Sequence, residues 1–354
     1  MKIAITADLH LTGKDNHPER YNALKNILDQ MQGDHVEHLI IAGDLFDTSQ
    51  KDFSEFEKLC ALKRYKSIQI HIIPGNHDAD LSDKSIAAEN VHVYQKPNFL
   101  DLDEGGTSFF MLPYSDGKTM GEILESKAET LKTKQWILIG HGDWSEGLRA
   151  PNPYEPGIYM PLTTSDVYRY QPLRVFLGHI HVPMDKDRVH YVGSPCGLDI
   201  TESGKRRYVI YDTVLDEVEP RLVDTDVLFF DETFVMLPGE DEKTFIKNAC
   251  SERIKSWELS KEEREKVQVR IKVRGFCSDR KGLMSWIKTS FRYYASYKDE
   301  DPDISEVLIS SGEDLRYIAE QVKDRVEHLE WREGYDEPDE GEILLAALHV
   351  IYGE

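Results

Sequence analysis

The sequence predicts an α/β fold, a two-layered sheet sandwich flanked by helices, joined to a small α+β domain. Short runs rich in Ile and Val alternate with helical patterns from Met1 to about Asp231. Five of these runs end directly at Asp, Asn or His. A helix, strand, helix, strand pattern follows in the C-terminal third. The chain has 354 residues, more than one core usually holds, so a large and a smaller domain are expected.

The five apolar runs predict buried strands at 2–7, 37–42, 68–74, 135–139 and 173–177. Sites collect at the carboxyl ends of strands in sheets that are covered on both faces. A helix is predicted at 18–31, because Pro18 stands at its start and Tyr21, Leu24, Leu28 and Met31 follow at helical spacing. A second helix, at 53–65, is a candidate contact in a homodimer, which the sequence leaves open.

Each strand ends in a short motif that contains metal-ligand side chains. Carboxylate, amide and imidazole donors without thiolates suit Mn, Fe or Zn in a hydrolytic site. Partners two residues apart leave an extended segment on the same side and can meet one ion. Glycine precedes four of the motifs and permits a sharp turn. The motifs are Asp8-Leu9-His10, Gly43-Asp44-Leu45-Phe46-Asp47, Gly75-Asn76-His77-Asp78, Gly140-His141 and Gly178-His179-Ile180-His181.

Any one of these motifs also has a plainer interpretation. Gly-Asp after a strand is usually a turn, and a histidine beside an apolar strand is more often a core or surface residue. Five motifs in this order, all at strand ends, favour a metal centre instead. The remaining histidines lack this context and are interpreted as ordinary: His17, His35, His38, His71, His92, His190, His328 and His349.

The pattern D-x-H, GD-x-x-D, GNH-D, GH and GH-x-H resembles the calcineurin-like metallophosphoesterases. The segment 175–199, with Glu202 and the strand 206–212, is similar to the SbcD family, the nuclease subunits of bacterial SbcCD repair complexes. This resemblance is close over residues 1–212 and looser beyond. Leu9 departs from the Trp that is common within D-x-H in that family. The resemblance implies a metallophosphoesterase-type two-sheet β-sandwich, a capping domain and two divalent ions, Mn²⁺ first, with Mg²⁺, Fe²⁺ or Zn²⁺ as alternatives.

The resemblance also implies roles for individual residues. One ion would be held by Asp8, His10, Asp44 and His181, and the other by Asp44, Asn76, His141 and His179, with Asp44 as the bridge. His77 would contact the phosphate and help expel the leaving group, or else only orient Asn76. Asp47 matches the second acid of GD-x-x-D, a position that some relatives replace with histidine.

The resulting hypothesis is a two-metal phosphodiesterase that uses metal-activated water. No motif offers a Ser or Cys nucleophile, which favours direct attack by water. A DNA exonuclease and endonuclease subunit of a double-strand-break repair complex is preferred to an esterase of nucleotides or small diesters. A non-catalytic scaffold is disfavoured because every ligand is present. A protein phosphatase is disfavoured because Asp78 stands in place of Glu and Asp47-Thr48-Ser49 lacks an Arg-Gly pair.

The formal net charge of −22 is unusual for a DNA enzyme, whose phosphate contacts normally come from basic surfaces. Ten Lys or Arg stand against two acids between Arg264 and Lys298. Alternation places Arg270, Lys272 and Arg274 on one strand face. An ordinary solvated strand, with nearby aromatic residues in the core, is an equally good interpretation. The candidate DNA contacts are Arg270, Lys272, Arg274, Arg280 and Lys281.

Three segments follow from these patterns: a nuclease domain at 1–231, a capping domain at 232–312 and an acidic helical tail at 313–354. Within the cap, 241–257, 267–274, 279–296 and 304–309 are predicted helix, strand, helix and strand. In the tail, helical spacing runs from Leu315 to Leu329, and after a break at 334–338 the residues from Ile343 to Tyr352 are apolar nearly all round. In the resembled family such helices dock on the coiled coil of an ATPase subunit, here an SbcC-like protein. This is preferred to packing on the chain's own domains, because a helix without a polar face should be buried.

The cysteines predict a reducing compartment. Cys60, Cys196, Cys250 and Cys277 are scattered without a CxxC pair, which is typical of reduced thiols in a cytoplasmic protein. The N-terminus enters a strand at once, which leaves no room for a signal peptide, and no apolar run approaches the roughly 18 residues of a membrane span. The Pro-, Gly- and Tyr-rich segment 145–162 is a candidate substrate rim or a long surface loop.

Overall fold

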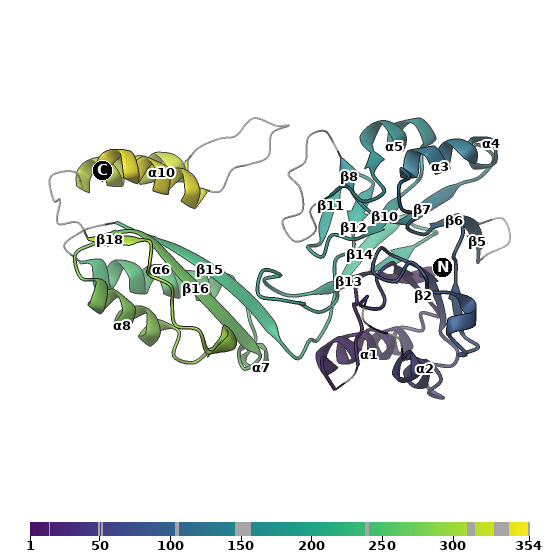
Figure 1. Cartoon of the computed structure of the whole chain (residues 1–354), viewed down its shortest axis with the longest axis horizontal. Coiled ribbons are helices and arrows are strands. Elements are labelled where there is room, and N and C mark those ends of the chain that lie inside the picture. Colours follow the sequence, from purple (N-terminus) through teal and green to yellow (C-terminus); the bar gives the residue numbers. More distant parts are fainter. Residues whose placement is uncertain are drawn as a thin grey trace. The chain divides into compact units, whose positions relative to one another are not determined.

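The computed structural model describes residues 1–13, 15–48, 50, 52–102, 106–145, 157–237, 241–309, 316–328 and 340–352. Internal contacts divide the chain into two units (Figure 1). The first unit comprises Met1–Leu198 and Lys205–Asp226, and the second comprises Asp199–Gly204 and Val227–Glu354. Each unit has its own hydrophobic core.

Two six-stranded sheets form the first unit. One has the order β14 (Glu217–Leu222), β13 (Arg207–Asp212), β1 (Lys2–Thr6), β2 (His38–Ala42), β3 (Gln69–Ile73), β4 (Val91–Val93). The other has the order β11 (Met184–Lys186), β12 (Val189–Tyr191), β10 (Val175–Gly178), β7 (Trp136–His141), β6 (Ser108–Leu112), β5 (Asn98–Asp101). The strands β1 to β4 are parallel, as are β6, β7, β10 and β12. The predicted strands are all present, and their carboxyl ends carry the motifs.

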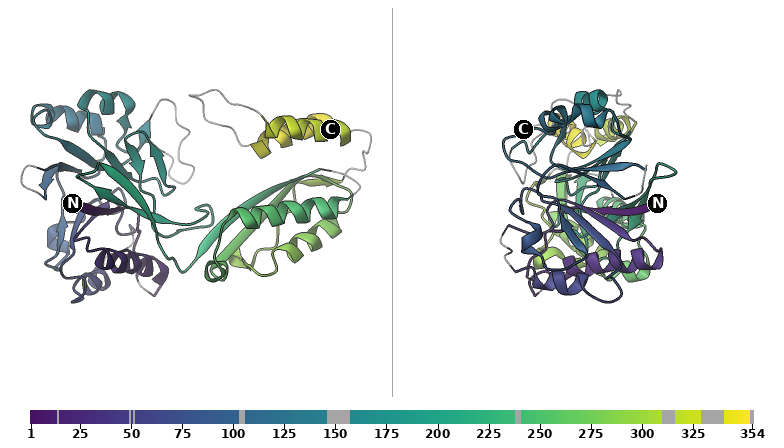
Figure 2. Two further views of the ribbon diagram at one scale, coloured as in Figure 1. Left: turned by 180° about the vertical axis from the view of Figure 1, so that it is seen from behind. Right: turned by 90° about the vertical axis from the view of Figure 1, so that its right-hand side faces the viewer.

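Side-chain alternation along the strands explains the layers. On β2, Ile40 faces the core between the sheets, whereas Leu39 and Ile41 face outward. Helices α1 (Pro18–Gly33) and α2 (Ser54–Cys60) cover the first sheet, and α3 (Met120–Ser126), α4 (Ala128–Leu131) and α5 (Thr164–Tyr170) cover the second (Figures 1 and 2). The predicted sandwich flanked by helices is therefore confirmed.

The second predicted helix is shorter than expected. It ends at Cys60 rather than at Tyr65. Turns follow, in which the amide of Tyr65 donates to the Leu62 carbonyl and that of Ile68 donates to the Tyr65 carbonyl. These turns bury the Tyr65 ring in the core, which an uninterrupted helix would not do.

The second unit is a four-stranded sheet with helices on one face. Strands β15 (Leu228–Met236), β16 (Val267–Cys277), β17 (Ala295–Ser296) and β18 (Val307–Ile309) are packed against α6 (Glu242–Ser256) and α8 (Arg280–Ser290), with the short α7 (Lys261–Arg264) between them in sequence. The predicted helix, strand, helix, strand order is present. The second helix ends at Ser290 instead of 296, because Ala295 and Ser296 are extended and pair with β16.

The C-terminal helices pack on this same unit. Helix α9 (Arg316–Glu327) and helix α10 (Glu340–Tyr352) contact each other, and α10 contacts β15 and β16. Their apolar cluster comprises Leu237, Phe276, Ala319, Val326, Leu344 and Leu348. The chain therefore buries these side chains itself, which is the less preferred of the two interpretations, and binding of a partner protein by the tail stays a prediction. Leu315, Leu329 and the break at 334–338 lie outside the described residues.

Two expectations about the environment can be compared with the structure. All four cysteines are buried and outside any disulfide among the described residues. Among the described residues, no helix combines the length and the apolar character that crossing a membrane would require.

Candidate metal centre

The turns that follow the strands aim the motif side chains at one another. Asp8, His10, Asp44 and His179 have positive φ angles of 52°, 44°, 50° and 89°. Non-glycine residues adopt this conformation rarely and at a cost, and such positions cluster at functional sites. The five motifs, far apart in sequence, thus converge where the strands of both sheets end.

One group of donors comprises Asp8, His10 and His181. The Nε2 atoms of His10 and His181 lie 3.2 Å apart. The Asp8 Oδ1 atom accepts a hydrogen bond of 2.9 Å from the His179 amide. Its Oδ2 atom is buried and has no hydrogen-bond partner among the described residues. A buried carboxylate oxygen beside two imidazole nitrogens fits a divalent cation, because an unsatisfied buried charge is otherwise costly.

The second group is centred on Asp44 and His141. The His141 Nδ1–H group donates to the Ala42 carbonyl at 2.9 Å, so Nε2 is directed at Asn76 Oδ1, 2.8 Å away, and at Asp44 Oδ2, 3.3 Å away. Asn76 Oδ1 also lies 3.3 Å from His179 Nδ1. A backbone carbonyl that fixes the tautomer of an imidazole is the usual support for a metal-ligating histidine.

Asp44 lies between these groups and belongs to two further sets of possible ligands, His10–Asp44–His77 and Asp8–Asp44–His141. Its Oδ2 atom is 3.6 Å from His10 Nε2 as well as 3.3 Å from His141 Nε2. The carboxylate is 1% exposed. Its carboxylate thus lies within reach of both donor groups, and the bridging role that the resemblance implies stays a prediction.

Burial dominates the electrostatics of the site. It raises the pKa of Asp8 to about 6 and lowers that of His10 to about 3. Burial would also raise the pKa of Asp44, but the neighbouring His141 charge holds it well below its usual range. Burial opposes protonation of His141, yet the carboxylates of Asp44 and Asp8 raise its pKa to about 10. A bound divalent cation would change the pKa values of these buried groups, because it would be the largest charge in the site.

Glycine makes room for neighbouring ligands. At Gly43, where φ is +92°, a Cβ atom would lie 2.0 Å from His141 Nδ1. At Gly178 it would lie 2.1 Å from the Ala42 carbonyl oxygen that orients His141. The sequence predicts glycine for sharp turns at the motifs, and at these two positions glycine also leaves space around the His141 ring.

His77 lies at the edge of the site. Its amide donates to Asp44 Oδ1 at 2.9 Å, its ring centroid is 4.7 Å from that of His10, and Nδ1 lies 3.0 Å from Thr48 Oγ1. Asp47 is half-buried, with its amide donating to the Leu11 carbonyl at 3.0 Å. His77 is thus close to the ligands, partly exposed and held in orientation.

Three supporting interactions escaped the sequence interpretation, although Asp78 itself belongs to the third motif. Arg20 on α1 donates to the His10 carbonyl, and Arg206 donates to the carbonyls of His181 and Ser194. Both arginines are buried. The carboxylate of Asp78 accepts the amides of Gly75 and Phe46, at 2.7 and 3.1 Å, and so joins the second and third motif loops. Their tertiary partners carry no local sequence signal.

Three of the five candidate DNA contacts on the cap have acidic partners. Arg270 and Lys272 lie 2.7 and 3.3 Å from Asp231, and Arg274 lies 3.1 Å from Glu306. Arg280 donates to the Ile304 carbonyl at 2.8 Å, and Lys281 is exposed. A pocket of about 580 Å³ is lined by Asp231, Thr233, Val235, Arg253, Lys272, Arg274 and residues 340–342 of α10. The predicted shared face exists, but its charges are largely matched within the unit.

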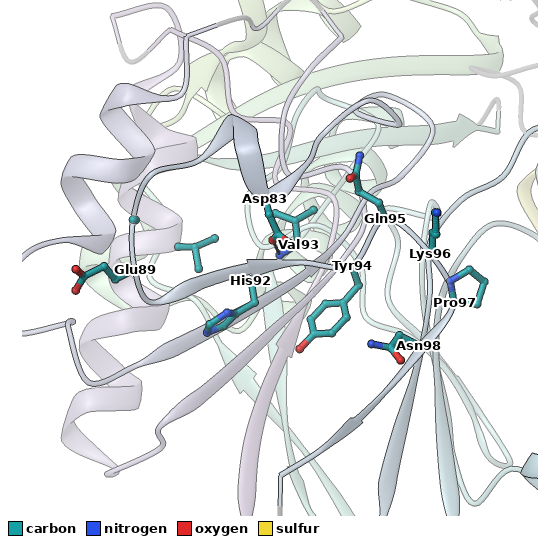
Figure 3. A pocket seen from close by; sticks show the side chains of 11 residues that line it. Asp83, Glu89, His92, Val93, Tyr94, Gln95, Lys96, Pro97 and Asn98 are labelled. Atoms are coloured by element: carbon teal, nitrogen blue, oxygen red, sulfur yellow. Dashed lines mark hydrogen bonds between the residues drawn. The ribbon is translucent and has the colours of Figure 1, made fainter.

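A further pocket, of about 730 Å³, lies along β4 and the following residues 94–98, and none of the predicted ligands lines it. Figure 3 shows His92 and Tyr94 pointing to the same side of the strand. Behind them His71 is buried, with Nε2 3.1 Å from His38 Nδ1 and Nδ1 3.2 Å from Tyr94 Oη. These histidines join the three strands β2, β3 and β4.

Comparison with known proteins agrees with this centre. The family model described as calcineurin-like phosphoesterase matches residues 1–183, slightly more than half of the chain. The D subunit of the SbcCD nuclease of Staphylococcus saprophyticus is 27% identical over 236 residues, which cover 57% of this chain and 63% of that protein. The match thus spans less than two thirds of the relative.

Two solved structures are also similar. A protein of Thermus thermophilus is 13% identical, with a TM-score of 0.41, and the match covers 62% of this chain and 98% of that one. An archaeal phosphodiesterase is 21% identical, with a TM-score of 0.33 and coverage of 63% and 100%. Such scores carry no argument about function. The motifs, the geometry of the donor groups and the match over residues 1–183 together place the chain in the calcineurin-like phosphoesterase family of metal-dependent hydrolases.

Proposed function

We propose that this chain is a DNA exonuclease and endonuclease, the nuclease subunit of an SbcCD-type double-strand-break repair complex. The observation that carries the hydrolytic part is the position of Asp44, shared by two groups of metal-ligand donors. The assignment to DNA is supported by the similarity to the D subunit of an SbcCD nuclease.

The residues of the site divide the work. Asp8, His10, Asp44 and His181 would hold one divalent ion, and Asp44, Asn76, His141 and His179 the other. Mn²⁺ is the first choice, ahead of Mg²⁺, Fe²⁺ and Zn²⁺. When bound, such a pair supplies positive charge at the phosphate and a water of lowered pKa. The chain itself orients these donors. The Ala42 carbonyl accepts a hydrogen bond from the His141 ring, and Asp8 Oδ1 accepts one from the His179 amide.

His77 is the proposed catalytic acid. Its position beside Asp44 and its contact with Thr48 hold the ring at the edge of the site, where it would contact the phosphate and donate a proton to the leaving oxygen. Asp47, the second acidic residue of GD-x-x-D, is the other proposed catalytic residue.

Further partners are proposed from the resemblance. The capping segment 232–312 would contact DNA through Arg270, Lys272, Arg274, Arg280 and Lys281. The tail 313–354 would bind the coiled coil of an SbcC-like ATPase, using exposed side chains such as Tyr317 and Val350. A homodimer through α2 is a further proposal. We place the protein in the cytoplasm without a membrane partner.

The alternative is an esterase of nucleotides or other small phosphodiesters. The observation that favours it is the pairing of the basic strand with Asp231 and Glu306, which leaves less positive charge for DNA. A non-catalytic scaffold is disfavoured by the complete set of donors.

One assay separates these functions. Linear duplex DNA, single-stranded DNA and bis(p-nitrophenyl) phosphate are each incubated with Mn²⁺, Mg²⁺ or a chelator. The proposed nuclease degrades both DNA substrates and the chromogenic diester with Mn²⁺, and none of them with the chelator. Hydrolysis of the chromogenic diester alone would favour the small-substrate esterase, and inactivity with every metal would favour the scaffold.

A further inference from the structure

Two tyrosines lie beside the candidate metal centre, next to His179. The Tyr159 ring centroid is 4.8 Å from that of the His179 imidazole, with an interplanar angle of 41°. The Tyr114 ring is 6.3 Å from the Tyr159 ring, at an angle of 40°. Both tyrosines are half-buried, so part of each remains in contact with solvent. Neither residue belongs to the metal motifs.

Asp143 fixes Tyr159 relative to the ligands. The Tyr159 amide donates to Asp143 Oδ2 at 2.8 Å, and the Asp143 amide donates to the Tyr159 carbonyl, also at 2.8 Å. Gly142 permits this close approach, because a Cβ atom there would lie 2.5 Å from the Tyr159 carbonyl oxygen. Asp143 follows His141 by two residues, so the position of the Tyr159 ring is tied to that ligand.

Tyr114 is held next to a different ligand loop. Its amide donates to the Pro74 carbonyl at 3.0 Å, just before the Gly75-Asn76 turn, and the Ser115 amide donates to Met160 Sδ at 3.2 Å. Met160 is 2% exposed and has a positive φ of 41°. A strained residue of this kind persists only where its surroundings determine it, and it is typical of functional sites. The two tyrosine segments are therefore joined to each other and to the site.

Tyr159 is only half-buried, so packing against His179 leaves part of it open to solvent. Aromatic rings that are fixed beside a phosphate-binding site and partly open to solvent are suited to stacking nucleobases, whatever the base. Stacking also needs no positive charge, which suits a chain with a formal net charge of −22.

We infer that Tyr159, with Tyr114 beside it, is a platform for the nucleobase next to the scissile phosphate. The substrate class is then phosphodiesters of nucleosides, and the base contributes to binding without being read for sequence. This inference rests on the proposed phosphodiesterase function and deepens it. It also gives residues 157–162, at the end of the 145–162 segment, the role of a substrate rim.

The test uses four dinucleoside monophosphates that differ only in their bases. They are thymidylyl-thymidine and its three analogues in which one or both thymines are replaced by hydrogen. The enzymes are the wild type, Tyr159→Leu, Tyr159→Phe and Tyr114→Leu. Tyr168→Leu is the matched control, because Tyr168 is an exposed tyrosine on α5. Manganese content and circular dichroism are measured for every variant.

The expected result is a loss that depends on one base. Tyr159→Leu should lower kcat/KM for the substrates that carry this base by about 5- to 150-fold, the equivalent of one stacked base, mainly through KM. The analogues without this base should react equally with the wild type and Tyr159→Leu. Tyr159→Phe and Tyr168→Leu should behave as wild type, and Tyr114→Leu should show a smaller loss of the same kind.

Two results would overturn the platform. Equal losses on all four substrates, with metal content unchanged, would give Tyr159 a structural role. Equal wild-type rates on all four substrates, unaffected by Tyr159→Leu, would exclude a base contact while leaving the phosphodiesterase function intact. The proposed function fails in a different way, through hydrolysis of bis(p-nitrophenyl) phosphate with no cleavage of any DNA.

Discussion

The two units of this chain differ in how their charged side chains are paired. In the first, carboxylates and imidazoles face one another in a buried centre, and Asp8 Oδ2 has no hydrogen-bond partner among the described residues. In the second, the Arg and Lys side chains of β16 lie beside carboxylates of the same unit. A buried carboxylate oxygen without a hydrogen-bond partner indicates a ligand-binding site. Ion-paired side chains on a half-buried face, by contrast, are sufficient for folding. Chemistry is therefore expected in the first unit, and any DNA contact by the second must compete with its own ion pairs.

Removing the shared carboxylate should have the largest effect. Asp44→Ala is expected to reduce hydrolysis of bis(p-nitrophenyl) phosphate by at least about 10³-fold, because both donor groups lose a member. Metal analysis should find less bound Mn²⁺ per chain. Asp34→Ala, at an exposed aspartate after α1, is the matched control and should keep full activity. An active Asp44→Ala enzyme would contradict the two-ion arrangement.

His77 tests whether the edge of the centre takes part in chemistry. His77→Ser should lower kcat by about 10² to 10⁴-fold, the usual contribution of a positioned proton donor, while Mn²⁺ content stays at the wild-type level. A variant that loses metal as well as activity would show that His77 supports the ligands. Thr48→Val, which removes the hydroxyl next to Nδ1, should give a smaller loss of the same kind.

The sandwich and the convergence of the motif side chains were predictable because their signals are local. Apolar strands that end in Asp, Asn or His identify themselves within a few residues, and parallel strands bring those ends together. Arg20, Arg206 and Tyr159 could not be found in this way. Each acts through a partner that only the tertiary fold places nearby, such as the carbonyl of His10 or His181.

The same reason explains what the sequence could not show in the C-terminal half. Alternation along β16 correctly places Arg270, Lys272 and Arg274 on one face, but pairing with β15 sets Asp231 opposite Arg270, which a single strand cannot reveal. Likewise the apolar pattern of α10 predicts burial without naming the surface that provides it. Leu344 and Leu348 join a cluster with Phe276 of β16.

The second unit can be tested through salt dependence. The Arg274 pair is more exposed than the Arg270 pair, since its partner Glu306 is 58% exposed against 18% for Asp231. Exposed pairs are weak, so Arg274 should exchange its partner for a DNA phosphate most easily. Replacing all three basic residues with Gln should then flatten the slope of log K against log[salt] by about 0.9, one contact on duplex DNA.

Arg274→Gln alone should reproduce that change, and hydrolysis of the chromogenic diester should not alter in either variant. A flattening of the slope by about 2.7 in the triple variant would mean three phosphate contacts. All three basic residues would then exchange their carboxylate partners for DNA phosphates. An unchanged slope would make the basic strand purely structural.

The smallest expected effect concerns a buried histidine outside the metal centre. Burial, together with His38 and His92, lowers the pKa of His71 from 6.5 to about 3. The folded state therefore favours the neutral ring, and this contribution to stability is complete above pH 6.5 and is lost as the pH falls toward 3. The loss is up to about 1.4 kcal/mol per pH unit, since unfolding lets the ring take up a proton.

In His71→Phe this contribution is absent. Urea unfolding at pH 7.5, where both rings are uncharged, gives the cost of the lost contacts with Tyr94 and His38. Between pH 6.5 and 5 the free energy of unfolding should then fall less steeply in the variant than in the wild type. Parallel slopes would mean that His71 stays accessible to protons in the folded protein. A steeper loss of unfolding free energy in the wild type would show that the His71 imidazole is buried for structural reasons alone. The buried imidazoles of the candidate metal centre differ, because they lie beside carboxylates and are the proposed metal ligands.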